Sequence, residues 1–67
     1  MIFDNKKLSA LLNKNEMRQV QLAKEIKRSK STVYEYVKGT ESPGEEAEFS
    51  ISRVFSIPVE ELFKKVE

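Results

Sequence analysis

The chain contains no cysteine and no histidine, and in a sequence of only 67 residues this limits how a stable fold can be built. A domain of this size buries only roughly 60% of the surface that its unfolded chain exposes, so its core is thin. Without cysteine, neither a disulfide nor a thiolate metal site can reinforce that core. We therefore expect a single domain, residues 1–67, stabilised by helix packing, by helix capping or by association with a second copy.

Apolar residues recur at helical spacing in five short segments, and residues that start or stop helices flank these segments. The pattern predicts helices over residues 4–15, 18–26, 29–38, 44–55 and 59–66. Asp4 and Ser29 are suited to cap the first and third helices, because their side-chain oxygens can accept hydrogen bonds from free backbone N–H groups. Gly39 is suited to end the third helix in a left-handed conformation. No segment requires a β-strand, so the predicted fold class is all-α with five helices.

The residue types present also narrow the function. The absence of histidine removes the commonest general base near neutral pH, and the sequence has neither a Gly-rich phosphate loop nor paired acids in a recognisable context. We expect no enzyme, no catalytic residue, no metal and no cofactor. No apolar run approaches the ~20 residues of a membrane span, and no signal peptide is recognisable, so we expect a cytoplasmic protein.

Charge is distributed unevenly along the chain. Residues 1–38 hold nine Lys or Arg against four Asp or Glu, whereas residues 39–67 hold three against seven. The two parts therefore carry +5 and −4, which together give the net charge of +1. A basic half in a nearly neutral chain favours an acidic partner, and nucleic acid is one such partner. Chance imbalance is the alternative explanation.

Residues 19–38 have the features of two short helices that cross at a tight turn. Ala23 is small enough to allow the second helix to approach the first closely. A shared buried face is predicted from Leu22, Ile26, Val33 and Tyr36. The outward positions of the second helix are polar, namely Lys30, Ser31, Tyr34 and Glu35. This combination is typical of a helix-turn-helix unit, whose second helix reads the major groove of DNA.

At these residues the chain resembles the Cro/CI repressor family, which includes phage repressors and Xre-type bacterial regulators. The resemblance runs from about Leu8 to Phe63. The matching segments, in order, are Gln19-x-x-Leu22-Ala23, Ser29-x-Ser31-Thr32-Val33, Gly39, Pro43 and Phe55-x-Ile57-Pro58-Val59-Glu60-Glu61-Leu62-Phe63. Membership would imply a five-helix, lambda-repressor-like DNA-binding domain.

The resemblance also implies roles for individual residues. In that family, the positions of Lys30, Ser31 and Glu35 face base edges, and the position of Gln19 contacts a phosphate. The positions of Arg18, Thr32 and the loop 38–42 approach the DNA backbone. Arg28, in the basic turn between the two helices, is added to these contacts. The predicted phosphate contacts are then Arg18, Gln19, Arg28, Thr32, Lys38 and Thr40.

Three positions depart from the family pattern. Lys27 stands where the family usually has glycine, so we expect this lysine to adopt a positive φ at some energetic cost. Arg28 stands where an apolar residue is usual, so either the turn is less buried or only the stem of Arg28 packs. Val37 stands where glutamate is frequent. These departures concern the geometry of the turn rather than the fold.

The chemistry of the outward residues agrees in part with base reading. Lys30 can donate to guanine O6 and N7, Ser31 can donate or accept, and Glu35 can accept from a cytosine amino group. Lys24, Lys27, Arg28 and Lys38 can neutralise phosphates. Lys30 and Glu35 can equally be a solvated helix face. The predicted base contacts are thus Lys30, Ser31, Glu35 and Tyr34, although Tyr34 can equally be a surface tyrosine. Tyr36 is expected in the core.

These observations predict a sequence-specific DNA-binding regulator in a bacterial or phage-infected cell, most simply a repressor. Its partner would be operator DNA, with no membrane and no small-molecule ligand. A dimer on a pseudo-palindromic operator is expected, with an interface at Phe55, Ile57, Val59 and Phe63. The alternative is a protein-interaction module on the same fold, as in an antitoxin or an anti-repressor.

Overall fold

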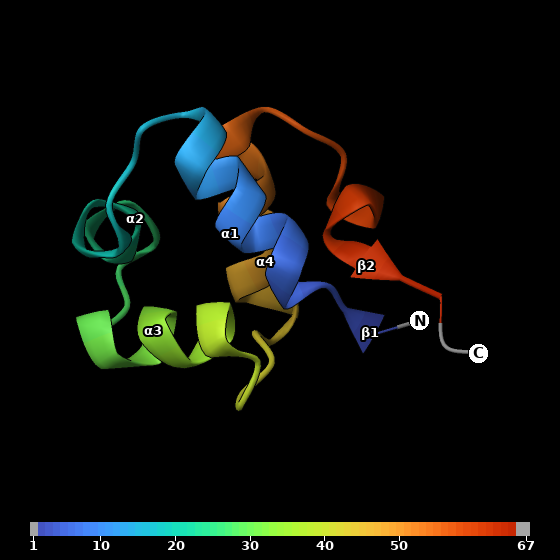
Figure 1. Cartoon of the computed structure of the whole chain (residues 1–67), viewed down its shortest axis with the longest axis horizontal. Helices are drawn as coiled ribbons and strands as arrows, with labels where there is room; N and C mark the ends of the chain where they lie inside the picture. The colour runs from blue at the N-terminus through green and yellow to red at the C-terminus, as the bar shows by residue number, and fades with distance from the viewer. Residues whose placement is uncertain (1, 66–67) are drawn as a thin grey trace.

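A computed structural model describes residues 2–65 as four α-helices, one 3₁₀ helix and a two-stranded sheet (Figure 1). The helices are α1 (Asn5–Lys14), α2 (Gln19–Ile26), α3 (Lys30–Lys38) and α4 (Glu45–Phe55). The 3₁₀ helix η1 (Val59–Leu62) leads into β2 (Phe63–Lys64), which pairs antiparallel with β1 (Ile2–Phe3). The protein is thus mostly helical. No helix within residues 2–65 combines the length and the apolar character required to cross a membrane.

The predicted starts and ends of the first four helices are confirmed. Asp4 precedes α1, and its Oδ1 atom accepts hydrogen bonds from the backbone N–H groups of Lys6 and Lys7, each at 3.1 Å. Ser29 precedes α3, and its Oγ atom accepts from the Thr32 N–H at 3.1 Å. Gly39 ends α3 with φ +89°. These local hydrogen bonds satisfy backbone groups that a helix leaves free at its ends.

A small core joins all of these elements. Leu8 of α1, Leu22 of α2, Val33 of α3, Ile51 of α4 and Leu62 of η1 are fully buried. The remaining buried apolar residues are Phe3, Leu11, Leu12, Ala23, Ile26, Tyr36 and Ala47. The predicted core positions of Leu22, Ala23, Ile26, Val33 and Tyr36 are therefore confirmed.

The turn between α2 and α3 is built around Lys27. This residue has φ 57° and ψ 46°, so the predicted positive φ is confirmed. The Lys27 N–H donates to the Lys24 carbonyl at 3.3 Å, and the Arg28 N–H donates to the Ala23 carbonyl at 2.9 Å. This pair of bonds is a Schellman motif, which usually has glycine at the left-handed position. Arg28 is exposed, so the turn is open to solvent at that position and not buried.

The predicted fifth helix over residues 59–66 is too long, and the prediction that no strand forms is wrong. Helical structure in this segment is limited to the single 3₁₀ turn of η1, and Val66 lies outside the described residues. The chain then extends, because Phe63 pairs with Phe3 and their rings meet edge to face at 6.4 Å. The Asp4 N–H also donates to the Leu62 carbonyl at 2.7 Å. Contacts with the start of the chain thus override the local helical preference of residues 63–65.

The left-handed conformation of Lys27 makes a first prediction. Lys27→Gly should raise the free energy of unfolding by about 0.5–1 kcal/mol, because relief of roughly 1–2 kcal/mol of left-handed strain exceeds the extra entropy that glycine loses. Lys24→Gly, inside α2, is the matched control and should lower it by about 1 kcal/mol. Urea denaturation of both variants measures the difference. Equal destabilisation by the two substitutions would contradict the left-handed turn.

Candidate nucleic-acid interface

A groove runs along the exposed side of α3. Its volume is about 620 Å³, and its walls come from the start of α2, from α3 and from the loop that follows α3. The lining residues are Gln19, Lys30, Ser31, Tyr34, Glu35, Lys38 and Thr40. All seven are residues for which the sequence predicts a DNA contact. The fold therefore brings the four predicted base contacts together with three of the predicted phosphate contacts.

Three predicted phosphate contacts lie outside this groove. Arg18 lines a neighbouring cleft, and Arg28 is exposed at the turn between α2 and α3, where its guanidinium donates to the Lys27 carbonyl at 3.3 Å. Thr32 is half-buried, and its hydroxyl lies 2.8 Å from the Ser29 hydroxyl at the cap of α3. Its side chain is thus already occupied in holding the start of that helix.

The end of α3 fixes the position of Thr40 in the groove. The Glu35 carbonyl accepts the N–H groups of Gly39, Thr40 and Glu41, at 2.9, 3.1 and 3.4 Å. The Asn5 side chain, reaching from α1, donates to the Val37 carbonyl at 3.1 Å. Glycine suits residue 39 because φ is positive there, and an added Cβ would lie 2.9 Å from Asn5 Nδ2, so the Asn5 side chain would have to move. The loop is therefore tied to α3, and the last turn of α3 is tied to α1.

Both signs of charge occur along the groove. Lys30 stands near one end and Lys38 near the other, and the Lys38 ammonium lies 5.8 Å from the centre of the half-exposed Tyr34 ring. This contact can hold Tyr34 and Lys38 in fixed relative positions. Glu35 is the acidic member of the groove. Its carboxylate, through a hydrogen bond and through its charge, raises the pKa of Glu41 above the ordinary value of 4.5.

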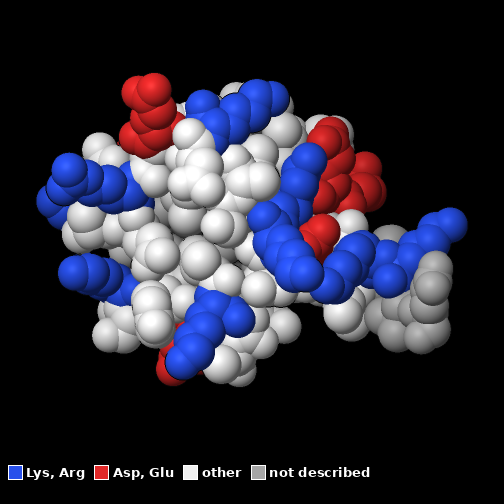
Figure 2. Space-filling model, in the orientation of Figure 1, with Lys and Arg blue, Asp and Glu red and all other residues white. Residues whose placement is uncertain are grey.

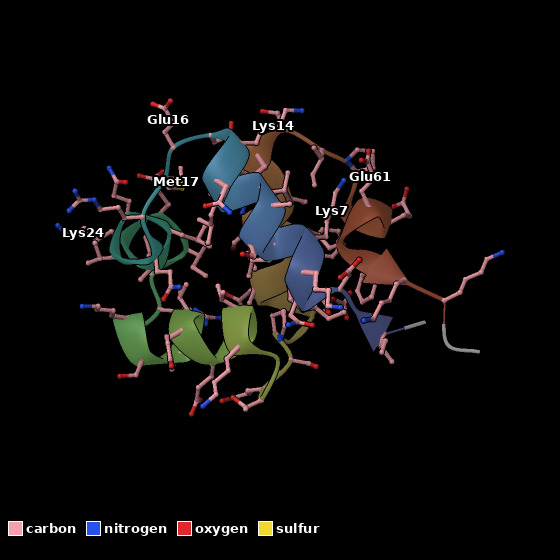
Figure 3. All side chains as sticks on the ribbon, in the orientation of Figure 1. Lys7, Lys14, Glu16, Met17, Lys24 and Glu61 are labelled. Carbon is pink, nitrogen blue, oxygen red and sulfur yellow. The ribbon has the colours of Figure 1, made fainter. Side chains whose placement is uncertain are left out.

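On the face shown in Figure 2, the positive charge lies in separate groups. Figure 2 shows Lys and Arg side chains around a largely uncharged central face, with acidic groups at its edges. Figure 3 shows Lys24 pointing outward from α2, at the opposite end of the molecule from Lys7 and Glu61. The Lys7 ammonium lies 3.9 Å from the Glu61 carboxylate, so Lys7 is partly neutralised.

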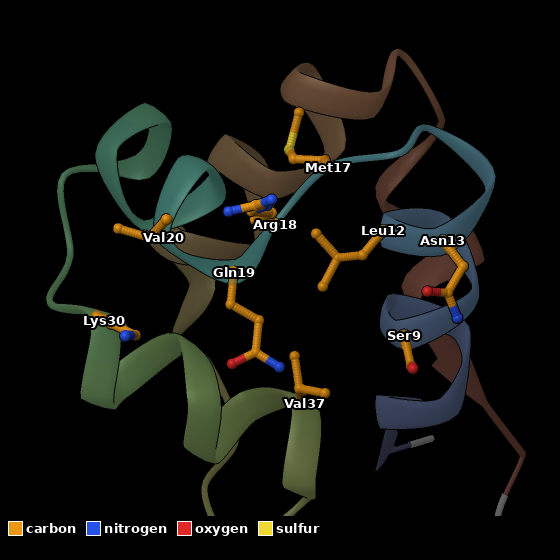
Figure 4. A pocket seen from close by; sticks show the side chains of 9 residues that line it. All are labelled: Ser9, Leu12, Asn13, Met17, Arg18, Gln19, Val20, Lys30 and Val37. Atoms are coloured by element: carbon orange, nitrogen blue, oxygen red, sulfur yellow. The ribbon is translucent and has the colours of Figure 1, made fainter.

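A second cleft adjoins the groove, and the sequence did not predict it. Its volume is about 450 Å³, and it lies between α1 and the pair formed by α2 and α3 (Figure 4). It shares Gln19 and Lys30 with the groove. Ser9 and Asn13 of α1 also line it. Their spacing of four residues places both on one side of a helix, which is the one sequence signal that points to them.

The four residues predicted for a dimer interface do not form a free apolar surface. Phe55, Ile57, Val59 and Phe63 are all half-buried and pack against the core of their own chain. Within residues 2–65, the large apolar residues that are exposed lie elsewhere, at Ile2, Val20, Tyr34 and Phe49. Dimer formation through residues 55–63 therefore remains a prediction.

Comparisons with known protein families, with curated proteins and with solved structures found no match to this chain.

The acidic pair at the end of α3 makes a second prediction. The pKa of Glu41 is higher in the folded chain than its ordinary value of 4.5, so folding favours the protonated carboxyl group. This contribution to the stability of the fold is complete below pH 4.5, and it is lost as the pH rises through the higher pKa of the folded chain. Near neutral pH the two carboxylates therefore repel each other. Glu41→Gln should raise the melting temperature near pH 7 and have less effect near pH 4.

Thermal unfolding at the two pH values measures this effect. Glu25→Gln, which removes an exposed carboxylate from α2, is the control and should show no such pH-dependent gain. The same pH-dependent gain in both variants would show that it comes from loss of any negative charge, and not from the contact between Glu41 and Glu35.

Proposed function

We propose that this chain is a sequence-specific DNA-binding transcription regulator. The observation that carries the proposal is the groove along α3, in which four residues suited to base contacts adjoin three suited to backbone contacts. In this proposal α2, the turn at Lys27 and α3 act as a helix-turn-helix unit of a lambda-repressor-like domain. The resemblance to the Cro/CI family supports the same function.

Helix α3 would enter the major groove of DNA. An α-helix with its side chains is roughly 10–12 Å wide, and the major groove is roughly 12 Å wide, so the two fit. Lys30 and Ser31, at the start of α3, would approach base edges first, with Lys30 donating to guanine. Glu35, one turn further along, would accept from a cytosine amino group. Tyr34 would contact a phosphate or a thymine methyl beside them.

Contacts to the DNA backbone would lie on both sides of the base-contacting residues of α3. Gln19 and Arg18 belong to the start of α2, whereas Lys38 and Thr40 belong to the end of α3 and its loop. Contacts on two sides fix the register of a helix in the groove, although they carry no sequence information themselves. Arg28 would add a further charge near the DNA backbone.

A single reading helix recognises few base pairs, so a regulator of this size would act as a dimer on a pseudo-palindromic operator. Its two copies of α3 would lie ~34 Å apart, one helical turn of DNA. Occupation of such a site would block polymerase sterically, which makes repression the simplest outcome. The proposed activity is not enzymatic, requires no cofactor and is exercised in the cytoplasm of a bacterial or phage-infected cell.

Selection of binding sites from a pool of random DNA duplexes tests the proposal. We expect enrichment of a site with two related half-sites, and release of the protein from DNA by moderate salt, because bound cations displace counterions from phosphates. No enrichment, together with no retention on random DNA or heparin at low salt, would contradict DNA binding. That result would favour the protein-interaction alternative.

The division between base and backbone contacts makes a third prediction. Lys30→Ala should cost about 1–3 kcal/mol of binding free energy on the selected duplex and should relax the base preference at one position. Arg28→Ala should weaken binding to every duplex, and it should reduce the slope of log affinity against log salt by about 0.9.

Fluorescence anisotropy on the selected duplex and on a shuffled duplex, over a series of salt concentrations, measures both effects. Lys14→Ala, at the end of α1 and outside the groove, is the control for loss of a positive charge. Equal losses on both duplexes for Lys30→Ala and Arg28→Ala would show that Lys30 does not read bases.

A further inference from the structure

The cleft between α1 and the pair formed by α2 and α3 offers hydrogen-bond donors and positive charge without any acidic group. Its polar lining residues are Ser9, Asn13, Arg18, Gln19 and Lys30. Each side chain carries at least one O–H or N–H donor, two of them are cations, and none of the lining residues is a carboxylate. Such a lining suits an anion with several acceptor oxygens.

These polar groups are available to a ligand. Within residues 2–65, the side chains of Ser9, Asn13 and Gln19 form no hydrogen bond to another protein group. The same part of the chain holds one ion pair, Lys7 with Glu61, so Arg18 and Lys30 are not neutralised by a carboxylate. By contrast, the start of α2 is capped internally, since the Gln21 side chain accepts the Arg18 N–H at 2.8 Å.

The remaining walls of the cleft are apolar. Leu12, Met17, Val20 and Val37 form them, as Figure 4 shows around the Gln19 side chain. Apolar walls lower the local dielectric constant and so strengthen charged hydrogen bonds. They also suit contact with a sugar ring, which is less polar than the phosphate attached to it.

The cleft lies next to the groove along α3. It shares Gln19 and Lys30 with the groove along α3, so a ligand that fills the groove continues into the cleft. A helix seated in the major groove has a sugar-phosphate strand on each side. In the proposed complex the loop at Thr40 would adjoin one of these strands, and the cleft would adjoin the other.

We infer that the cleft receives a phosphodiester group of the DNA backbone, and that Ser9 and Asn13 of α1 are contacts to it. The inference rests on the proposed function and extends the interface to a helix outside the helix-turn-helix unit. Helix α1 would thus fix the angle at which α3 enters the major groove.

Charge substitutions at Asn13 test the inference. Asn13→Lys should tighten binding to every duplex about threefold or more at low salt, and it should steepen the salt slope by about 0.9. Asn13→Asp should weaken binding at least about tenfold, because it places a carboxylate beside a phosphate. Ala10→Lys and Ala10→Asp are the controls, since Ala10 is an exposed residue of the same helix that does not line the cleft. Both should stay within about twofold of the parent chain.

Opposite effects of Lys and Asp at residue 13, with small effects at residue 10, would support the inference, because unfolding cannot produce a gain and a loss at one site. If the two positions respond alike while the parent chain still binds the selected duplex, the inference is wrong and the proposed function stands. If the parent chain shows no salt-dependent binding to any duplex, both are wrong.

Discussion

The apolar contact between α2 and α3 is the constraint on which the rest of the structure depends. Leu22 and Val33 are fully buried between these helices and their neighbours, and Ala23 is small enough to let the helices cross closely. The left-handed turn at Lys27 connects them. Because the groove combines Gln19 of α2 with residues of α3, any change in this crossing would separate its two walls. The core is thin, so even modest changes at these positions alter the groove.

Features that depend on neighbouring residues could be predicted from the sequence. Asp4, Ser29 and Gly39 act on backbone groups of their own helix, so the pattern of residues is sufficient. The positive φ of Lys27 was predicted from the resemblance instead, because the Cro/CI family usually has glycine at that position. The outward positions of α3 could be predicted too, since the exposed side of a helix is determined by periodicity. These local rules also explain why the bounds of the first four helices agree with the structure.

Features that depend on distant contacts could not be predicted. The extension of Phe63 is decided by Phe3, at the other end of the chain, and not by the helical pattern around it. The cleft depends on how α1 lies across α2 and α3, so no single segment indicates it. The hydrogen bond between the hydroxyls of Thr32 and Ser29 shows a third limit, because residue type alone does not reveal whether a polar side chain is free.

The charge of the groove is mixed, and this bears on how the surface would discriminate. Lys30 and Lys38 attract phosphate, whereas Glu35 repels it and has Glu41 as a close acidic neighbour. If the proposed function is right, such a surface would gain less from indiscriminate attraction to the DNA backbone than a uniformly basic one, and base contacts would carry more of the difference between sites. The net charge of +1 is consistent with that balance.

The most direct test of the central claim is an NMR titration, in which backbone amide shifts of the labelled protein are followed as the selected duplex is added. If α3 enters the major groove, the largest shift changes should occur at Gln19, along Lys30–Lys38 and at Thr40. Changes confined to the surface around Ile2 and Phe49, with the amides of α3 unaffected, would contradict a DNA-reading role for the groove.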